Sequence, residues 1–449
     1  MYDDINLRIW NIMRCSSLLL FLLLFFSLLV GAVSGNNTSG EEKTLKGHCM
    51  EVLKKALKDP APIHRILALE ALGETGDQET LPLIIDGLRD AHSTVRSRAA
   101  EALGRLGNKK AIPYLALALK DSQWTVRSYA AQALGKIPDR TTLPELKKAV
   151  EDGNLLVQIC AIEALAESGD ISLVSFLKKY LTHPFLTVRI TAAEALGKLG
   201  DPSGIPILLH ALNDPDWDIR RYGAVPLGGI PKKWALPHLI EALKDTEWPV
   251  RLCAAEALGK IGDEKAIPHL KGLLSDEEEA VRGYAVDALG RIGDKSAIPL
   301  LARAIKDPQE VVRREAAKAM GRIRDHEAIP YLAGALNDPD SGVRREAAAS
   351  LGIIGDSSAV DLLKKLLEDS DKTVRIEVAV GMIKLGDGSG METLKGLLED
   401  TNWQIRLQTL QALGDVSNPY IITIVEKALD DPRIQVRIYA SKLILMKLQ

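Results

Sequence analysis

Residues 250–259 read Val-Arg-Leu-Cys-Ala-Ala-Glu-Ala-Leu-Gly and residues 266–270 read Ala-Ile-Pro-His-Leu, and close variants of this pair recur along most of the chain. The arginine of the first motif returns every 31 residues from Arg65 to Arg437, and only Gln158 interrupts the series. Thirteen units are therefore in register over 372 residues without an insertion or a deletion. A fixed period of this length is typical of repeat proteins whose units stack side by side.

Each unit predicts two helices. An Asp lies six residues before the repeat arginine in twelve of the thirteen units, with His183 as the exception. Such an Asp accepts hydrogen bonds from the free N–H groups at a helix start. The first helix ends at a Gly, which can adopt the left-handed conformation, and the second opens with Pro in eight units, as at Pro268. Neither helix can bury its apolar stripe alone, so neighbouring units have to supply the core.

These motifs resemble the HEAT repeat, and within it the 31-residue HEAT-like class named after the phycobilisome bilin lyases. The resemblance covers residues 59–445. It implies an all-α fold, an α-solenoid of about 13 two-helix repeats that winds into a right-handed superhelix of about 26 helices. In this family the Asp and Arg of successive units are implied to form a ladder of charge-assisted hydrogen bonds. The class includes scaffolds, bilin lyases and a metal-dependent hydroxylase, so function has to be argued separately.

A hydrophobic segment precedes the repeats. Residues 18–33 are apolar except for Ser27 and Gly31, and residues 32–34 resemble a signal-peptide cleavage site. We expect residues 1–34 to be a signal peptide or a membrane anchor, with cleavage and retention both open. Residues 35–40 are then a linker, residues 41–58 a capping helix and residues 59–449 the solenoid. On this interpretation the repeat domain is extracytoplasmic, either secreted or held at a membrane by the N-terminal segment.

A partner-binding surface is expected where the units differ, on the concave face, which we assign to the second helices. The position eighteen residues after the repeat arginine carries aromatic and His side chains, which form either a recognition ridge or packing between repeats. Aromatic residues also gather around Pro226, which interrupts a first helix, and a binding site and a simple kink are the alternatives there. From these two groups the candidate partner-binding residues are Tyr114, Phe176, Trp217, Trp234, His238, His269 and Tyr331.

Other classes of function find little support. The 57 basic and 60 acidic side chains are well mixed, without the basic excess of a nucleic-acid-binding protein. The motifs of serine hydrolases, phosphate-binding loops, zinc proteases and dinucleotide-binding folds are missing. His238 and His269 occupy equivalent positions in adjacent units but lack the further ligands that a metal site needs. We therefore expect no catalytic residues, no metal, no cofactor and no small-molecule substrate.

The sequence thus predicts a non-enzymatic protein–protein interaction scaffold that binds a protein partner on its concave face. The alternative is a lyase or chaperone that acts on a chromophore-bearing protein, or another HEAT-like enzyme. This alternative depends on the family resemblance alone.

Overall fold

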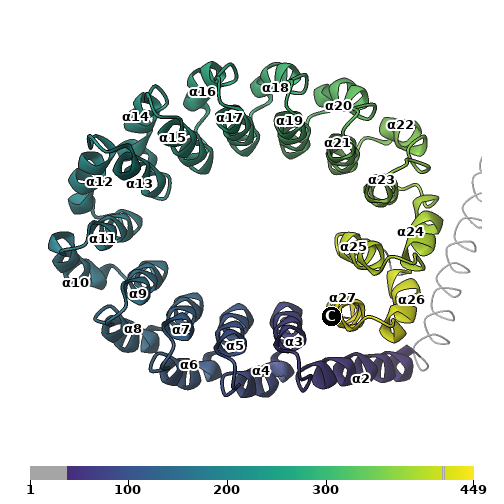
Figure 1. Ribbon diagram of the computed structural model, residues 1–449, viewed down its shortest axis with the longest axis horizontal. Coiled ribbons are helices and arrows are strands. Elements are labelled where there is room, and N and C mark those ends of the chain that lie inside the picture. Colours follow the sequence, from purple (N-terminus) through teal and green to yellow (C-terminus); the bar gives the residue numbers. More distant parts are fainter. Residues whose placement is uncertain (1–37, 417, 419, 449) are drawn as a thin grey trace, which may run out of the picture.

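A computed structural model describes residues 38–416, 418 and 420–448, and this part of the chain contains 26 α-helices, α2 to α27, and no strands. The all-α solenoid predicted from the repeat is therefore confirmed. The helices form two concentric layers, and the stack of repeats curves until its two ends meet in a ring around a central opening (Figure 1).

The first helix of each unit lies in the inner layer, at the central opening (Figure 1). These thirteen inner helices are α3 (Pro62–Thr75), α5 (Ser93–Leu106), α7 (Trp124–Lys136), α9 (Leu155–Glu167), α11 (Leu186–Lys198), α13 (Trp217–Leu227), α15 (Trp248–Ile261), α17 (Glu279–Ile292), α19 (Glu310–Ile323), α21 (Ser341–Ile354), α23 (Lys372–Lys384), α25 (Trp403–Leu413) and α27 (Ile434–Lys447).

The second helices form the outer layer, where most of them are short. These outer helices are α4 (Leu81–Gly87), α6 (Ile112–Ala118), α8 (Leu143–Ala149), α10 (Val174–Leu177), α12 (Ile205–Leu212), α14 (Lys232–Ala242), α16 (Ile267–Leu273), α18 (Ile298–Ala304), α20 (Ile329–Ala335), α22 (Val360–Lys364), α24 (Gly390–Leu398) and α26 (Ile421–Glu426). The N-terminal helix α2 (Thr38–Ala56) lies along the outside next to them (Figure 1).

This arrangement corrects the expectation that the second helices form the concave face. The first helices carry small residues where neighbouring units touch. A Cβ atom added to Gly259 would lie 2.8 Å from the Cα atom of Ala288 on the next inner helix, and Gly290 is in the same position relative to Ala319. Small residues let two helices approach closely, whereas larger side chains keep the outer helices apart. The closely spaced layer therefore forms the inside of the curve.

The predicted ladder of Asp and Arg side chains is confirmed. Arg251 donates from Nε to Asp276 Oδ2 (2.7 Å) and from Nη2 to Asp276 Oδ1 (2.8 Å), and its Nη1 donates to the backbone oxygen of Asp245 (2.9 Å). Nine such rungs join an arginine to the Asp 25 residues later: Arg65–Asp90, Arg96–Asp121, Arg127–Asp152, Arg220–Asp245, Arg251–Asp276, Arg282–Asp307, Arg313–Asp338, Arg344–Asp369 and Arg406–Asp431.

A rung is missing between α9 and α11, where Gln158 and His183 replace the Arg and Asp of the pair. Where both residues of the motif are present, the ladder is interrupted at two opposite places in the ring. Arg189 donates only to the backbone oxygens of His183 and Pro184. Its expected partner, Asp214, accepts the backbone N–H of Asp216, as the other repeat Asp residues accept theirs, but binds no arginine. Near Arg375, Lys372 Nζ lies 2.5 Å from Asp400 Oδ2 and takes the carboxylate that the arginine would bind. We call the α11–α13 and α23–α25 junctions the two seams. They have the two smallest contacts between neighbouring inner helices in the described ring.

The hydrophobic core divides at the same two places. One cluster of buried side chains runs from α11 to α23, and the other runs from α23 through α25, α27 and α2 to α11. Both clusters include side chains of α11 and of α23. On α11, Ile190 belongs to the first cluster and Val188 to the second. On α23, Val374 belongs to the first cluster and Ile376 to the second. The ring is therefore two packed arcs that meet at the seams.

The C-terminal helix closes the ring. The sequence ends in a conspicuously apolar helix, and its side chains Leu443, Ile444 and Leu445 are all at least 96% buried, because α27 packs against α2 and α3. Lys442 Nζ lies 2.6 Å from Glu74 Oε2, and Gln435 Nε2 lies 3.2 Å from His64 Nε2. The open right-handed superhelix that we expected is thus replaced by a closed ring.

The expected location of the protein also needs correction. Crossing a bilayer takes about 20 mainly apolar residues. The longest described helix, α2, has 19 residues and includes several charged ones, and none of the helices from α2 to α27 is long and apolar enough to be a membrane span. The prediction of a membrane-anchored or secreted protein is withdrawn on this finding. The segment on which it depended, residues 1–34, lies outside the described residues.

Candidate protein-interaction surface

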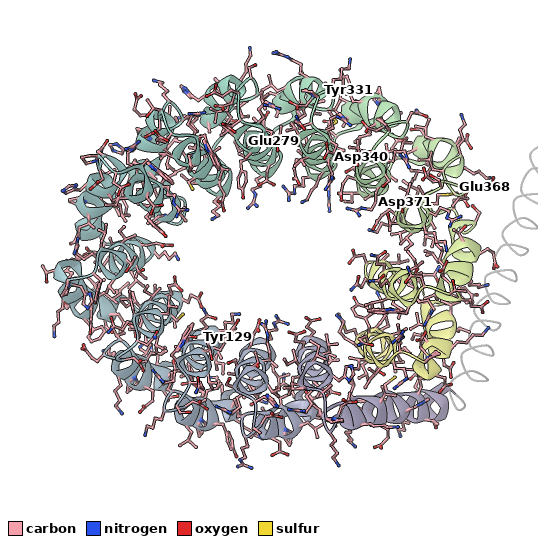
Figure 2. All side chains as sticks on the ribbon, viewed as in Figure 1. Tyr129, Glu279, Tyr331, Asp340, Glu368 and Asp371 are labelled. Carbon is pink, nitrogen blue, oxygen red and sulfur yellow. The ribbon has the colours of Figure 1, made fainter. Side chains whose placement is uncertain are left out.

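The inner helices present one repeat position to the central opening. Figure 2 shows Tyr129, two residues after the repeat arginine of α7, on this side of the ring. The equivalent residues on other inner helices include Tyr222, Tyr284 and Tyr439, with Cys160 and Cys253 on α9 and α15. Tyr222 is 47% exposed and Tyr284 is 39% exposed. Four of the thirteen inner helices, α7, α13, α17 and α27, therefore carry a tyrosine at this position.

Among the inner helices, exposed aromatic side chains are most numerous on α13 and α15. Trp217, Tyr222 and Trp248 are each at least 40% exposed, and we call these three residues the aromatic cluster. The Arg221 guanidinium lies 4.8 Å from the centre of the Tyr222 ring and 5.9 Å from that of Trp217, so it joins the two rings by cation–π contacts. Asp218 Oδ1 accepts a hydrogen bond from Arg221 Nε at 2.5 Å and holds the guanidinium in place.

The irregular sequence around Pro226 explains the form of this region. α13 continues through Pro226, and only the four residues 228–231 separate it from α14. A Cβ atom at Gly223 would lie 2.5 Å from the backbone nitrogen of Leu212, so α13 packs unusually tightly on α12. Pro226 and the exposed aromatic side chains thus occur in the same unit.

A pocket of about 430 Å³ opens on the inner face beside Tyr284, between α17 and α19. Asp287 accepts hydrogen bonds from Arg291 Nε (2.6 Å) and from Arg322 within it. Burial by itself raises the pKa of Asp287, but the two guanidinium groups outweigh it and lower the pKa below its usual value. The lining as a whole has four acidic and three basic side chains, so the pocket carries both charges with a small acidic excess.

Three carboxyl groups on the inner helices have a raised pKa, and burial is the main cause for Glu70. Burial is the main cause for both Glu163 and Glu377, and the neighbouring carboxylates Glu194 and Glu346 respectively add to it. Partial shielding from water therefore disfavours the charged form of these side chains.

The residues selected from the second helices lie on the outside of the ring. Tyr331 is at the outer rim in Figure 2, and Tyr114 and Tyr331 are 37% and 40% exposed. Phe176 packs against Tyr180 at 5.4 Å and against Lys147 Nζ at 5.3 Å. The other members of this group, Trp234, His238 and His269, lie on α14 and α16. Partner binding by this outer group stays a prediction.

His238 and His269 have no companions for a metal ion. Both side chains are exposed on neighbouring outer helices. In the described part of the chain, no group of three or more His, Cys, Asp and Glu side chains is arranged to hold a metal.

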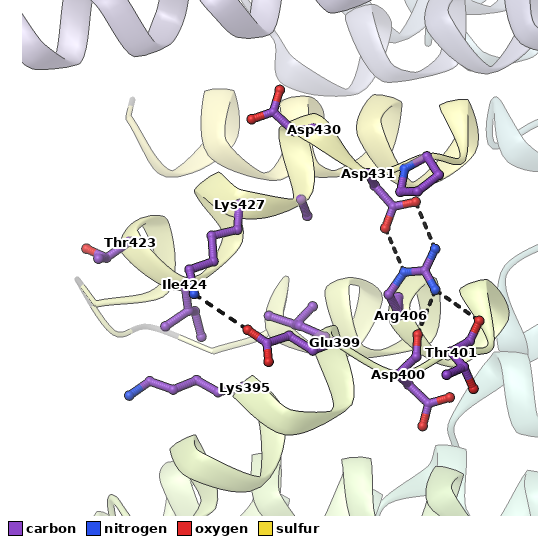
Figure 3. Close-up of a pocket in the computed structure, with 13 residues that line it drawn as sticks. Lys395, Glu399, Asp400, Thr401, Arg406, Thr423, Ile424, Lys427, Asp430 and Asp431 are labelled. Carbon is purple, nitrogen blue, oxygen red and sulfur yellow. Dashed lines mark hydrogen bonds and ion pairs between the residues drawn. The ribbon is translucent and has the colours of Figure 1, made fainter.

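A second hollow, of about 660 Å³, lies between α24 and α26 (Figure 3). The Arg406–Asp431 rung forms one side, with 2.6 Å between Nε and Oδ2, and Arg406 also donates to the backbone oxygen of Asp400. Lys427 Nζ lies 3.5 Å from Glu399 Oε1 across the mouth. Most of its charged groups pair with one another, so the hollow is the space between two stacked units.

The fold and this surface define a class of protein, the α-solenoid that presents a repeated inner face. The chain matches the family model described as HEAT repeats seven times, over residues 50–123, 115–185, 170–226, 210–282, 270–352, 306–383 and 330–402. The chain therefore belongs to the HEAT-repeat family, as its motifs predicted. No curated protein matches it.

Solved structures with a similar fold perform different tasks. Human deoxyhypusine hydroxylase in complex with glycerol is 23% identical, with 70% of this chain and 97% of that chain covered and a TM-score of 0.28. The CpcE–CpcF complex of phycocyanin lyase from Nostoc sp. PCC7120 is 24% identical, with 54% and 94% covered and a TM-score of 0.33. The Kap95:Nup1 complex is 14% identical, with 86% and 65% covered and a TM-score of 0.45. These similarities concern the fold alone.

Proposed function

We propose that this protein is a non-enzymatic scaffold that binds a protein partner on the inner face of its ring, with the aromatic cluster as the main anchor. The observation that carries the proposal is the exposure of Trp217, Tyr222 and Trp248 on two neighbouring helices, beside Arg221. Trp, Tyr and Arg are the residues that contribute most to binding at protein interfaces. Large aromatic surfaces that stay in contact with water are typical of a surface that a partner covers.

The charge of the wall indicates what kind of partner fits. Acidic and basic groups on the inner helices pair locally, as in Glu256–Lys260 (2.8 Å) and Glu194–Lys198 (2.7 Å). A wall of paired charges attracts neither a polyanion nor a strongly basic chain over long distances. We therefore propose a partner that offers apolar side chains and hydrogen-bonding groups to the aromatic cluster, as a folded protein or a peptide segment does.

The test compares three full-length baits in affinity capture followed by mass spectrometry. The inner variant carries Trp217→Ala, Tyr222→Ala and Trp248→Ala. The matched outer variant carries Tyr114→Ala, His238→Ala, His269→Ala and Tyr331→Ala, which are also exposed side chains. Circular dichroism and thermal unfolding first establish that both variants fold.

A protein that binds the wild type and the outer variant, but not the inner variant, supports the proposal, and cross-linking then has to place it on α13 and α15. Loss in the outer variant alone would move the binding site to the outer helices. If the same proteins bind all three baits, or none binds reproducibly, the aromatic cluster is not a binding site and the proposal fails.

A further inference from the structure

We infer that the ring is built to open and close: three rigid blocks turn about the two seams and separate where α27 meets α2 and α3. The blocks are the N-terminal one from α2 to α11, the central one from α13 to α23, and the C-terminal one from α25 to α27. This inference does not depend on the proposed function, because it concerns only how the units are joined.

The ladder supplies the first argument. Between α13 and α23 five consecutive rungs, from Arg220–Asp245 to Arg344–Asp369, tie each unit to the next with paired hydrogen bonds of 2.7 to 2.9 Å. At the seams Arg189 and Arg375 lack this partner, and the Nε atom of Arg375 is buried without a hydrogen bond. A bidentate Arg–carboxylate pair fixes orientation as well as distance, so a junction without it has one restraint fewer. The α9–α11 junction also lacks a rung, but α9 and α11 share a larger contact and one core cluster, so we place the turns at the two seams.

The core supplies the second, independent argument. The two clusters of buried side chains change over at α11 and α23, the helices that border the seams. Motion between packed bodies is easiest where few buried contacts cross the boundary. Both seams lie near the ends of the long axis of the ring (Figure 1), so turning about them changes the width of the central opening.

The closure itself also lacks a rung. Arg437 donates to the backbone oxygens of Asp431 and Pro432, and Asp59, the first Asp of the series, accepts instead from Ala61 N–H and lies 3.0 Å from His64 Nδ1. The ends of the ring are held by a core cluster that continues from α27 into α2 and α3, and by a few polar contacts such as Lys442–Glu74. Such a junction, which no covalent bond secures, is where a closed ring of rigid blocks separates.

The thiol of Cys49 provides a chemical probe of the contact between α2 and α27. Cys49 on α2 and Ser441 on α27 are both fully buried, and the Ser441 hydroxyl, which donates to the backbone oxygen of Arg437, lies near enough to the Cys49 thiol to affect its pKa. Burial is the main reason that the pKa of this thiol is raised to about 12. Alkylation of Cys49 therefore requires separation of α2 from α27, whereas Cys160 and Cys253 on the inner wall are only partly buried.

The experiment follows Cys49 alkylation by N-ethylmaleimide in the full-length protein, together with amide hydrogen exchange, both by peptide mass spectrometry. We expect Cys49 to react at a slow but finite rate while the amides of α17 and α19 stay protected. If Cys49 reacts only when α17 and α19 exchange, the ring opens only by global unfolding and the inference is wrong.

Two variants test the closure and a seam separately. Ser441→Cys places a second thiol against Cys49, and its oxidation should lock the ring. We expect exchange in α2 and α27 to slow at least about tenfold on oxidation and to recover with reductant, while α17 is unchanged. Lys372→Ser frees Asp400 for Arg375, and the restored rung should slow Cys49 alkylation about tenfold. If the exchange rates of α2 and α27 do not change on oxidation, the ring does not open at the closure. If the alkylation rate of Cys49 is the same in Lys372→Ser as in the wild type, the α23–α25 seam is not a hinge.

Discussion

The ladder permits a controlled measurement of one rung, because Asp245 and Asp214 occupy the same repeat position in neighbouring units. Each carboxylate accepts a backbone N–H at 2.9 Å, from Glu247 and Asp216 respectively. Only Asp245 also binds an arginine, with Arg220 Nε and Nη2 at 2.7 and 2.8 Å. Replacement of each Asp by Asn preserves the backbone contact, so the difference between the two variants isolates the rung.

The magnitude follows from the burial of the pair. Arg220 and Asp245 are 15% and 14% exposed, so water replaces the lost hydrogen bonds poorly. Asp245→Asn removes the negative charge and turns an amide N–H₂ group toward the guanidinium. A hydrogen bond to a charged group contributes about 1.5–3 kcal/mol, so we expect a loss of about 2–3 kcal/mol. Asp214→Asn should cost less than about 0.5 kcal/mol.

Amide hydrogen exchange is the suitable assay, because a long repeat array need not unfold in one step. The loss expected for Asp245→Asn corresponds to exchange in α13 and α15 that is about 30 to 150 times faster, and α5 and α7 serve as distant controls. Asp214→Asn should leave exchange in α11 and α13 within about twofold of the wild type. Equal effects of the two substitutions would show that the ladder does not hold units together, and would remove the main argument for the seams.

Three further predictions follow from the same contacts. The guanidinium of Arg96 lowers the pKa of Asp121, and that of Arg344 lowers the pKa of Asp369. These ion pairs stabilise the folded protein above the unfolded Asp pKa of about 3.9, and their contribution is lost as the pH falls through the lower native pKa. The Tm measured by circular dichroism should therefore drop steeply below about pH 4. Gly259→Ala should destabilise the protein by about 1–3 kcal/mol because its Cβ meets Ala288, while Gly272→Ala, with nothing within 4 Å, should be neutral or raise the Tm slightly. Arg324 is the only non-glycine residue with positive φ (58°) in the described chain, so Arg324→Gly should stabilise by up to about 1 kcal/mol in urea unfolding, and a loss of stability would show that its backbone is not strained.

Most of the fold could be predicted from the sequence because a solenoid is built from local and nearest-neighbour contacts. The helix starts at Asp, the left-handed ends such as Gly262 (φ 66°) and the Asp–Arg rungs are all encoded within one unit and its neighbour. The assignment of inner and outer layers failed, although a signal was available. Gly259 and Ala288 mark the first helices as the closely spaced layer, and that layer has to be the inside of the curve.

Ring closure was not predictable from the repeat period, because it depends on the sum of many small rotations between units. The sequence nevertheless contains a trace of it in α27. Eight residues after the repeat arginine most units have Gly, whereas α27 has Leu445, which is 4% exposed. An apolar side chain of this size at an exposed chain end would be unfavourable, and its burial shows that the end is covered.

The candidate site could be predicted only in part. The break at Pro226 directed attention to the unit where Trp217 and Tyr222 are exposed, because departures from a repeat pattern often mark special sites, and its role in binding stays a prediction. Tyr222 itself shares its repeat position with Cys160 and Cys253, so the position shows no uniform chemistry along the sequence. Only the structure shows that this repeat position faces the central opening, because its direction depends on which layer lies on the inside of the curve (Figure 2).

Closure also fixes the number of repeats that this protein can have. Thirteen inner helices share a full turn, which is about 28° of rotation for each unit. An open solenoid can gain or lose a unit by gene duplication or deletion and keep its curvature. Here one additional 31-residue unit would make the ends overlap unless every junction flattened by about 2°. Natural selection should therefore act on the number of units, because only that number closes the ring. Natural variation in this chain should occur by substitution within units more readily than by a change in the number of units.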